Sequence, residues 1–385
     1  MCGRVLFQFY SNLCSYWRSS LRLCSLILLV FSMMTRSGRR VVLHVDVNKT
    51  IVMADSAQNQ SLRETLNMAL AETCYGTVND AGEFVWNGEL PSALNGPATH
   101  TDNAISYRKY SWQVFPDPEP GTNFAEFKKA KKARRQLTGR FAESEGPASS
   151  LSRVLDKLER EQDGIFLADS FLSSMWQLHQ SDMCFSVIFR TFGDDYEEVV
   201  SEWNDFCLGK HPRYPQVSMP QRVVEKVAAW ERRENDVWLH TDTVDNEGSG
   251  ASSTLRSLAE AKAWYLRNTA DGHSLFIRDH WYPWRKAGER AHQGKVLPIA
   301  VDMQGRLRAD EPVQIFFDDN VQPERAKIVD VVATLPNGQR LYQKDIWRRF
   351  CIRVDPLEVM TQLDYFDRHV RRVVEQETQS SPTQS

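Results

Sequence analysis

Several apolar runs along the chain stop abruptly at polar residues. Continuous apolar runs of this length are typical of strands that are covered on both faces, and Asp and Asn are among the poorest strand formers. The pattern therefore predicts buried strands that carry polar groups at their carboxyl ends. The clearest runs are VVLHVD (41–46), MCFSVIFRT (183–191) and PVQIFFDD (312–319).

Segments with helical spacing of apolar residues separate these strands. Strands that alternate with helices predict a mostly parallel sheet sandwiched by helices, in which ligands bind outside the carboxyl ends of the strands. Three strands end in polar residues, so we expect those residues to share one crevice. Helices are expected within 53–76, 124–137 and 149–180, strands within 273–280, 328–334 and 350–356, a hairpin within 76–88, helices and loops over 196–265, and a flexible loop over 242–253.

The composition is that of an ordinary globular protein, with 42% hydrophobic and 25% charged residues among 385. The formal net charge of −3 provides no global field for nucleic acid or an anionic membrane. Seven cysteines without a CxxC pair indicate reduced thiols, and no histidine spacing predicts zinc. The basic run KKAKKARR (128–135) lacks interleaved aromatics, so we favour a solvated helical face over nucleic-acid binding.

The first 40 residues lack Asp and Glu and contain an apolar run at 23–34. This run is shorter than the roughly 20 residues that cross a bilayer, so we expect no stable membrane span. A signal peptide, a transit peptide and a translation start at Met33 or Met34 remain open, and we treat residues 1–40 as a leader or dispensable extension. The sequon at Asn48 would be glycosylated in a secretory compartment, which favours a cytoplasmic protein. Organelle targeting or membrane anchoring through residues 1–34 is the alternative.

The polar strand ends resemble the motifs of the haloacid dehalogenase superfamily, in the same order along the chain. The apolar strand followed by Asp46-Val47-Asn48-Lys49-Thr50-Ile51 is similar to the first motif, which usually reads Asp-x-Asp-x-Thr. Thr191, closing SVIFRT, is similar to the second motif, and Asp318 with Asp319, closing IFFDD, to the fourth. The third motif is a lysine or arginine upstream of the acidic strand, for which Lys286 and Lys295 both qualify; we favour Lys286.

The resemblance implies an α/β fold, a three-layer Rossmann-like parallel sheet with an inserted cap that selects the substrate. The expected organisation along the chain is a core formed by 41–60 and 151–360, a cap insertion at 61–150, and a terminal helix with a disordered tail at 361–385.

The resemblance also implies roles for the motif residues. Asp46 would attack phosphorus as a nucleophile, and Asp46, the Asn48 carbonyl, Asp318 and Asp319 would hold Mg²⁺ through hard oxygen ligands. Thr191 and Lys286 would stabilise the phosphoryl oxygens. Thr50 and Lys295 are expected to contact the substrate.

Asn48 departs from the motif, because the residue at that place normally exchanges a proton with the leaving group and with water. Losing general acid–base help costs roughly 10²–10⁴ in rate. We therefore expect either a Mg²⁺-dependent phosphohydrolase or phosphotransferase that acts on a small phosphorylated molecule, or a weak or inactive descendant that binds a phosphorylated ligand or a protein.

Overall fold

The computed structural model describes residues 39–55, 59–96, 103–119, 124–233, 236–243, 251–322, 324–341 and 343–379. The expected leader up to residue 38 and the tail from residue 380 lie outside the described residues. The described residues from Arg40 onward belong to one compact unit.

A mostly parallel sheet flanked by helices forms the centre of the molecule, which confirms the expected α/β class. Its eight strands run in the order β13-β11-β1-β5-β9-β6-β7-β8, and only β7 and β8 are antiparallel to their neighbours. The strands are β1 (Val41–Asp46), β5 (Phe185–Thr191), β6 (Val224–Arg232), β7 (Val237–Thr243), β8 (Ala251–Leu255), β9 (Ser274–Arg278), β11 (Val313–Asp318) and β13 (Cys351–Arg353).

Both faces of the sheet centre are covered, which explains the continuous apolar runs. On one face, Phe171 packs against Phe189 and Phe366 against Phe317, at ring-centroid distances of 6.1 and 5.1 Å. On the other face, the Tyr265 hydroxyl donates to the Gln314 side chain at 2.8 Å. The helices concerned are α6 (Asp169–Gln180), α7 (Tyr196–Cys207) and α11 (Tyr365–Gln379) on the first face and α8 (Leu258–Asn268) on the second.

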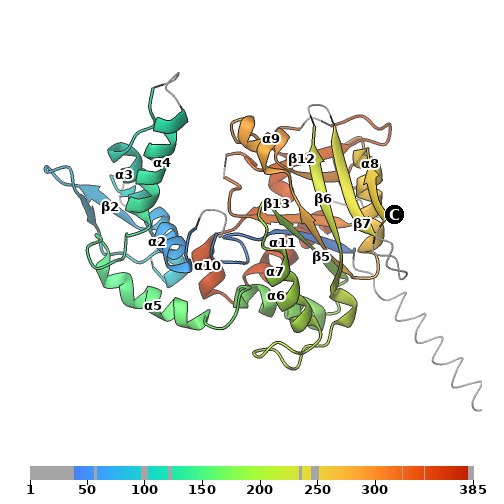
Figure 1. Cartoon of the computed structure of the whole chain (residues 1–385), viewed down its shortest axis with the longest axis horizontal. Coiled ribbons are helices and arrows are strands. Elements are labelled where there is room, and N and C mark those ends of the chain that lie inside the picture. The colour runs from blue at the N-terminus through green and yellow to red at the C-terminus, as the bar shows by residue number, and fades with distance from the viewer. Residues whose placement is uncertain are drawn as a thin grey trace, which may run out of the picture. The chain divides into compact units, whose positions relative to one another are not determined.

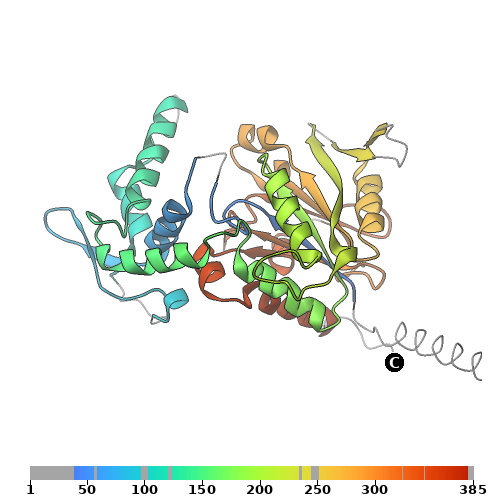
Figure 2. The ribbon, with the colours of Figure 1, turned by 60° about the horizontal axis from the view of Figure 1, so that its bottom comes forward.

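A second hydrophobic cluster forms between β1 and β5 in the chain, in the region expected to be a cap. It is built from Leu66, Leu70, Phe84, Phe141 and neighbouring residues, and it takes in Leu155 and Leu158, so the inserted part extends past residue 150. Figure 1 shows its helices grouped together, and the same blue-to-green segment stays together in the turned view of Figure 2. Its elements are α2 (Leu62–Thr73), β2 (Tyr75–Val78), β3 (Phe84–Trp86), β4 (Ile105–Ser106), α3 (Tyr107–Val114), α4 (Phe124–Thr138) and α5 (Ser152–Glu161).

Local sequence signals explain the boundaries of this inserted part. Ser61 caps α2 in a capping box with Glu64, which satisfies otherwise unpaired amides of the first turn. β2 and β3 form the expected antiparallel hairpin. The lysines of the basic helix α4 are exposed, as expected for a solvated face, whereas Arg134 is buried, with its guanidinium 3.7 Å from the Trp112 ring and paired with Asp117 at 2.7 Å.

Two expectations about secondary structure are wrong, those of helices and loops over 196–265 and of a disordered tail from Glu375. The segment 196–265 contains three long strands (β6, β7 and β8) beside its helices, and the ends of the expected 242–253 loop belong to β7 and β8; residues 244–250 lie outside the described part. The tail is helical up to Gln379, because α11 continues past Glu375. The 328–334 strand is real, but as β12 (Val329–Thr334) it pairs with an unforeseen strand, β10 (Lys295–Ala300), in a separate parallel pair. The remaining helices are α9 (Trp281–Lys286) and α10 (Pro356–Thr361).

Candidate active site

Three of the predicted residues lie at the same edge of the sheet. Asp46, Thr191 and Asp318 are the last residues of β1, β5 and β11, which are adjacent parallel strands. Asp319 follows directly, and one carboxylate oxygen each from Asp46, Asp318 and Asp319 lies within 4.8 Å of the other two. The register of parallel strands thus brings together residues that are more than 270 positions apart in the chain.

Lys295 lies between these carboxylates. It is the first residue of β10, its side chain is 1% exposed, and its ammonium donates to Asp46 Oδ1 and, at 2.9 Å, to Asp318 Oδ2. Lys286, which we favoured for the third motif, is exposed at the end of α9, and no interaction among the described residues joins it to the carboxylates. The geometry therefore favours Lys295 as the lysine of the site.

Burial and mutual repulsion control the charges of this cluster. Burial raises the pKa of Asp46 well above its usual range; Lys295 opposes this shift, while Asp318 and Asp319 add to it. Burial and the neighbouring charge of Asp318 raise the pKa of Asp319 to about 6. Burial alone lowers the pKa of Lys295, but Asp318, Asp46 and Asp279 together raise it above the usual lysine value. Lys295 therefore stays a cation, and the neighbouring carboxylates repel one another when they are ionised.

The tight turn after β1 fixes the position of Thr50. The Val47 carbonyl accepts from the amides of Thr50, Ile51 and Val52 at 3.3, 3.0 and 2.9 Å. The Thr50 hydroxyl, fully buried, donates to Asp46 Oδ2 at 3.4 Å and accepts from the Asp319 amide at 3.2 Å. Thr50 therefore ties the ends of β1 and β11 together, through the Asp46 carboxylate and the Asp319 backbone amide.

Asn48 faces a carboxylate that sequence reasoning missed. Its Nδ2 donates to Asp195 Oδ2 at 2.9 Å, and its Oδ1 is buried without a hydrogen-bond partner. A Cβ placed on Gly193 would lie 2.6 Å from Asp195 Oδ2 and 3.3 Å from both Asn48 Nδ2 and Thr191 Oγ1. These three polar atoms therefore surround a space that only glycine leaves open.

Asp195 stands at the N-cap of α7, yet its carboxylate makes no capping hydrogen bond to the helix. A cavity of about 430 Å³ adjoins this group and is lined by Asn48 and Asp195 together with Gln60, Glu64 and Phe166. The Asp-Asp pair after Gly193 was the sequence signal that could have pointed to Asp195.

A buried ion pair supports the site from the second face of the sheet and was also missed. The Arg190 guanidinium donates to both oxygens of Asp279, at 2.8 and 2.6 Å, and to the Val296 carbonyl at 3.1 Å. Val296 follows Lys295 in β10, so Arg190 fixes the backbone beside the site lysine. The signal was present: an arginine inside an otherwise apolar strand requires a buried partner.

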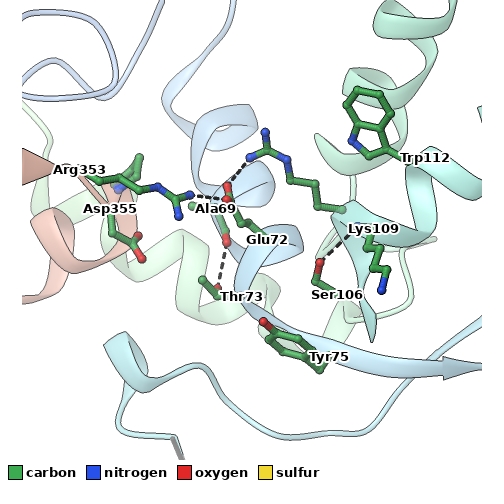
Figure 3. A pocket seen from close by; sticks show the side chains of 11 residues that line it. Ala69, Glu72, Thr73, Tyr75, Ser106, Lys109, Trp112, Arg353 and Asp355 are labelled. Carbon is green, nitrogen blue, oxygen red and sulfur yellow. Dashed lines mark hydrogen bonds and ion pairs between the residues drawn. The ribbon is translucent and has the colours of Figure 1, made fainter. Parts of the chain in front are cut away.

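A second hollow, of about 480 Å³, lies elsewhere and contains none of the predicted residues. Figure 3 shows Glu72 of α2 paired with Arg353, at the end of β13. Glu72 also accepts from Arg108. Since Arg353 is the register partner of Asp318, this ion pair connects the inserted part with the strand beside the acidic one.

No helix of the described residues is both long and apolar enough to cross a membrane. No protein-family model matches the chain, and no curated protein or solved structure is significantly similar to it. Any functional assignment therefore depends on the motif order and on the geometry of the carboxylate–lysine site.

Proposed function

We propose that the protein is a Mg²⁺-dependent phosphohydrolase or phosphotransferase of the haloacid dehalogenase type, with a Rossmann-like three-layer core and the segment around α2–α5 as its cap. The observation that carries the proposal is the position of Lys295, buried between Asp46 and Asp318 at the carboxyl edge of the sheet. The lysine and the carboxylates come from three separate segments. Burying such charged groups is energetically costly, and clusters of this kind are typical of functional sites.

The donor set fits a hard divalent cation. Asp46, Asp318 and Asp319 offer oxygen ligands within 4.8 Å of one another, and the Asn48 carbonyl is the further ligand that the motif implies. Three carboxylates against the single ammonium of Lys295 leave an excess of two negative charges, which one Mg²⁺ would balance. When bound, the ion would offset negative charge on the phosphoryl oxygens.

The chain's own residues would then act on the phosphoryl group. The Asp46 carboxylate attacks phosphorus, an O–P bond forms as the bond to the leaving oxygen breaks, and the leaving oxygen takes the electron pair. Lys295 and the Thr191 hydroxyl supply positive charge and a hydrogen bond to the phosphoryl oxygens. Thr191 Oγ1 accepts from the Gly193 amide at 2.8 Å, which orients the hydroxyl. Water then attacks phosphorus and releases Asp46.

Asn48 limits this reaction, because an amide does not exchange protons near neutral pH. We therefore expect good leaving groups to react and the aspartyl-phosphate to break down slowly. The same residue, with its unpartnered Oδ1, supports the alternative of a catalytically weak protein that binds a phosphorylated ligand or a protein partner.

The test is turnover of p-nitrophenyl phosphate and acetyl phosphate by purified protein with and without Mg²⁺, beside Asp46→Asn. The proposal requires metal-dependent turnover that the substitution abolishes. Absence of metal-dependent turnover, or turnover that survives Asp46→Asn, would leave the non-catalytic alternative.

A further inference from the structure

One carboxylate near the site is surrounded by three cations from three segments. Glu289 pairs with Lys131 of α4 at 3.7 Å, with Lys327 in the turn before β12 at 3.4 Å, and with Arg285 of α9. We call these four residues the Glu289 cluster. The four side chains carry a net charge of +2. Lys131 belongs to α4, in the inserted part of the chain.

A chain of contacts places the Glu289 cluster beside the carboxylate site. The Trp284 indole donates to the Lys327 carbonyl at 3.1 Å, and the Trp284 ring stacks on Phe192 at 5.5 Å. Phe192 follows Thr191, and its ring centroid lies 5.1 Å from the Lys295 ammonium. The charge of Lys327 is also among those that lower the pKa of Asp319, against the larger effect of burial.

The cluster has more positive charge than an ion pair between cap and core needs. One carboxylate and one cation would form that pair, and partly exposed pairs of this kind contribute little to stability. Here the surplus cations repel one another: although the Lys131 side chain is 54% exposed, partial desolvation lowers its pKa, Glu289 opposes this shift, and Arg285 and Lys327 lower the pKa further. Glu289 offsets only part of this repulsion, and a bound anion would offset more of it.

We propose that the Glu289 cluster binds a second anionic group, a phosphate or a carboxylate, of the same substrate whose phosphoryl group reacts at Asp46. The inference rests on the proposed function and names its substrate class: phosphomonoesters that carry another anionic group at their far end. Arginine and lysine are the residues that bind such groups, through charge-assisted hydrogen bonds. Because Lys131 belongs to the inserted part, this contact also gives that part a role in selecting the substrate.

The experiment compares matched esters on the Mg²⁺-loaded full chain at fixed ionic strength. One pair is a hexose bisphosphate and the hexose monophosphate that lacks only its second phosphate; the other is phosphoglycerate and glycerol phosphate, which differ by a carboxylate. We expect kcat/KM to favour one doubly anionic ester by roughly tenfold or more. The pair that shows the preference identifies the second group as phosphate or carboxylate.

The variants are Lys131→Gln and Lys327→Gln, with Lys132→Gln as the control because it removes the same charge from the next residue of α4, which does not pair with Glu289. We expect the first two to reduce the preference roughly five- to tenfold, mainly through KM, and the control to keep it. Thermal shifts with the preferred ester, measured for every variant, separate weaker binding from misfolding. Turnover without a preference in either pair, or a preference that Lys131→Gln and Lys327→Gln leave unchanged, overturns this inference alone. Absence of Mg²⁺-dependent turnover of every ester overturns the proposed function and this inference with it.

Discussion

Replacing Lys295 by methionine is the perturbation with the largest predicted effect on stability. The ammonium is 1% exposed and bonds two carboxylates that are 9% and 0% exposed. Removing one partner of a buried pair costs about 3–5 kcal/mol, since the remaining charge is left without compensation. Two carboxylates lose their partner here, so we expect a loss near the upper end, about 5 kcal/mol. Lys286→Met is the matched control and should change stability by less than about 0.5 kcal/mol, because Lys286 is exposed.

The assay is chemical denaturation of both variants and the parent chain in EDTA, at neutral pH and near pH 5. Folded Lys295→Met should bind more protons than the unfolded chain, because burial already raises the pKa of Asp46 and the lysine no longer opposes it. Its stability should therefore rise as the pH falls, so the deficit shrinks near pH 5. Equal stability of the two lysine variants, or a deficit that grows in acid, would refute the charge balance described for the site.

Three further predictions concern the surroundings of the site and α11. Asn48→Asp should place a second carboxylate 2.9 Å from Asp195 and lower the melting temperature above pH 6. Adding Asp195→Asn should restore the melting temperature, because the new amide can donate to the new carboxylate. Equal melting temperatures of the parent chain and Asn48→Asp would contradict this pairing. Gly193→Ala should keep the fold but lower kcat, since its Cβ would lie 2.6 Å from Asp195 Oδ2 and 3.3 Å from Thr191 Oγ1, the hydroxyl proposed to bind the phosphoryl group; unchanged kcat would contradict this role of Thr191. Burial and the charge of Arg372 lower the pKa of His369 to about 4, so the unfolded chain binds this proton more readily than the folded chain. The free energy of unfolding should therefore fall as the pH drops from about 6.5 towards 4, by about 0.7 kcal/mol per pH unit after allowing for the partial exposure of the ring. His369→Gln should flatten this slope in thermal melts, and an identical slope would contradict the assignment.

The strand ends of the site were predictable from the sequence because burial on both faces leaves a continuous apolar run. Asp46, Thr191 and Asp318 could be assigned to one edge from strand polarity alone, without any knowledge of packing. Strands β6 and β7, which pair antiparallel with each other, were missed because buried and exposed residues mix along β6, so no continuous apolar run marks it.

The choice between Lys286 and Lys295 could not be made from spacing. Both precede the acidic strand, and what distinguishes them is that Lys295 opens β10, a strand outside the main sheet, whose start lies against Asp46 and Asp318. The contact of Asp195 with Asn48 and the Glu289 cluster could not be predicted for the same reason, because each joins residues that are far apart in the sequence.

We propose Asp46 as the nucleophile, and trapping the covalent intermediate would show whether it is. The full chain is mixed with Mg²⁺ and acetyl phosphate, quenched in acid and mapped by peptide mass spectrometry. Because Asn48 cannot activate water, we expect a phosphorylated peptide to accumulate to a detectable level. It should carry the phosphoryl group on Asp46 as an acyl phosphate that hydroxylamine cleaves, and it should be absent in Asp46→Asn. Phosphate on another residue, or an unmodified chain that nevertheless turns over the substrate, would contradict it.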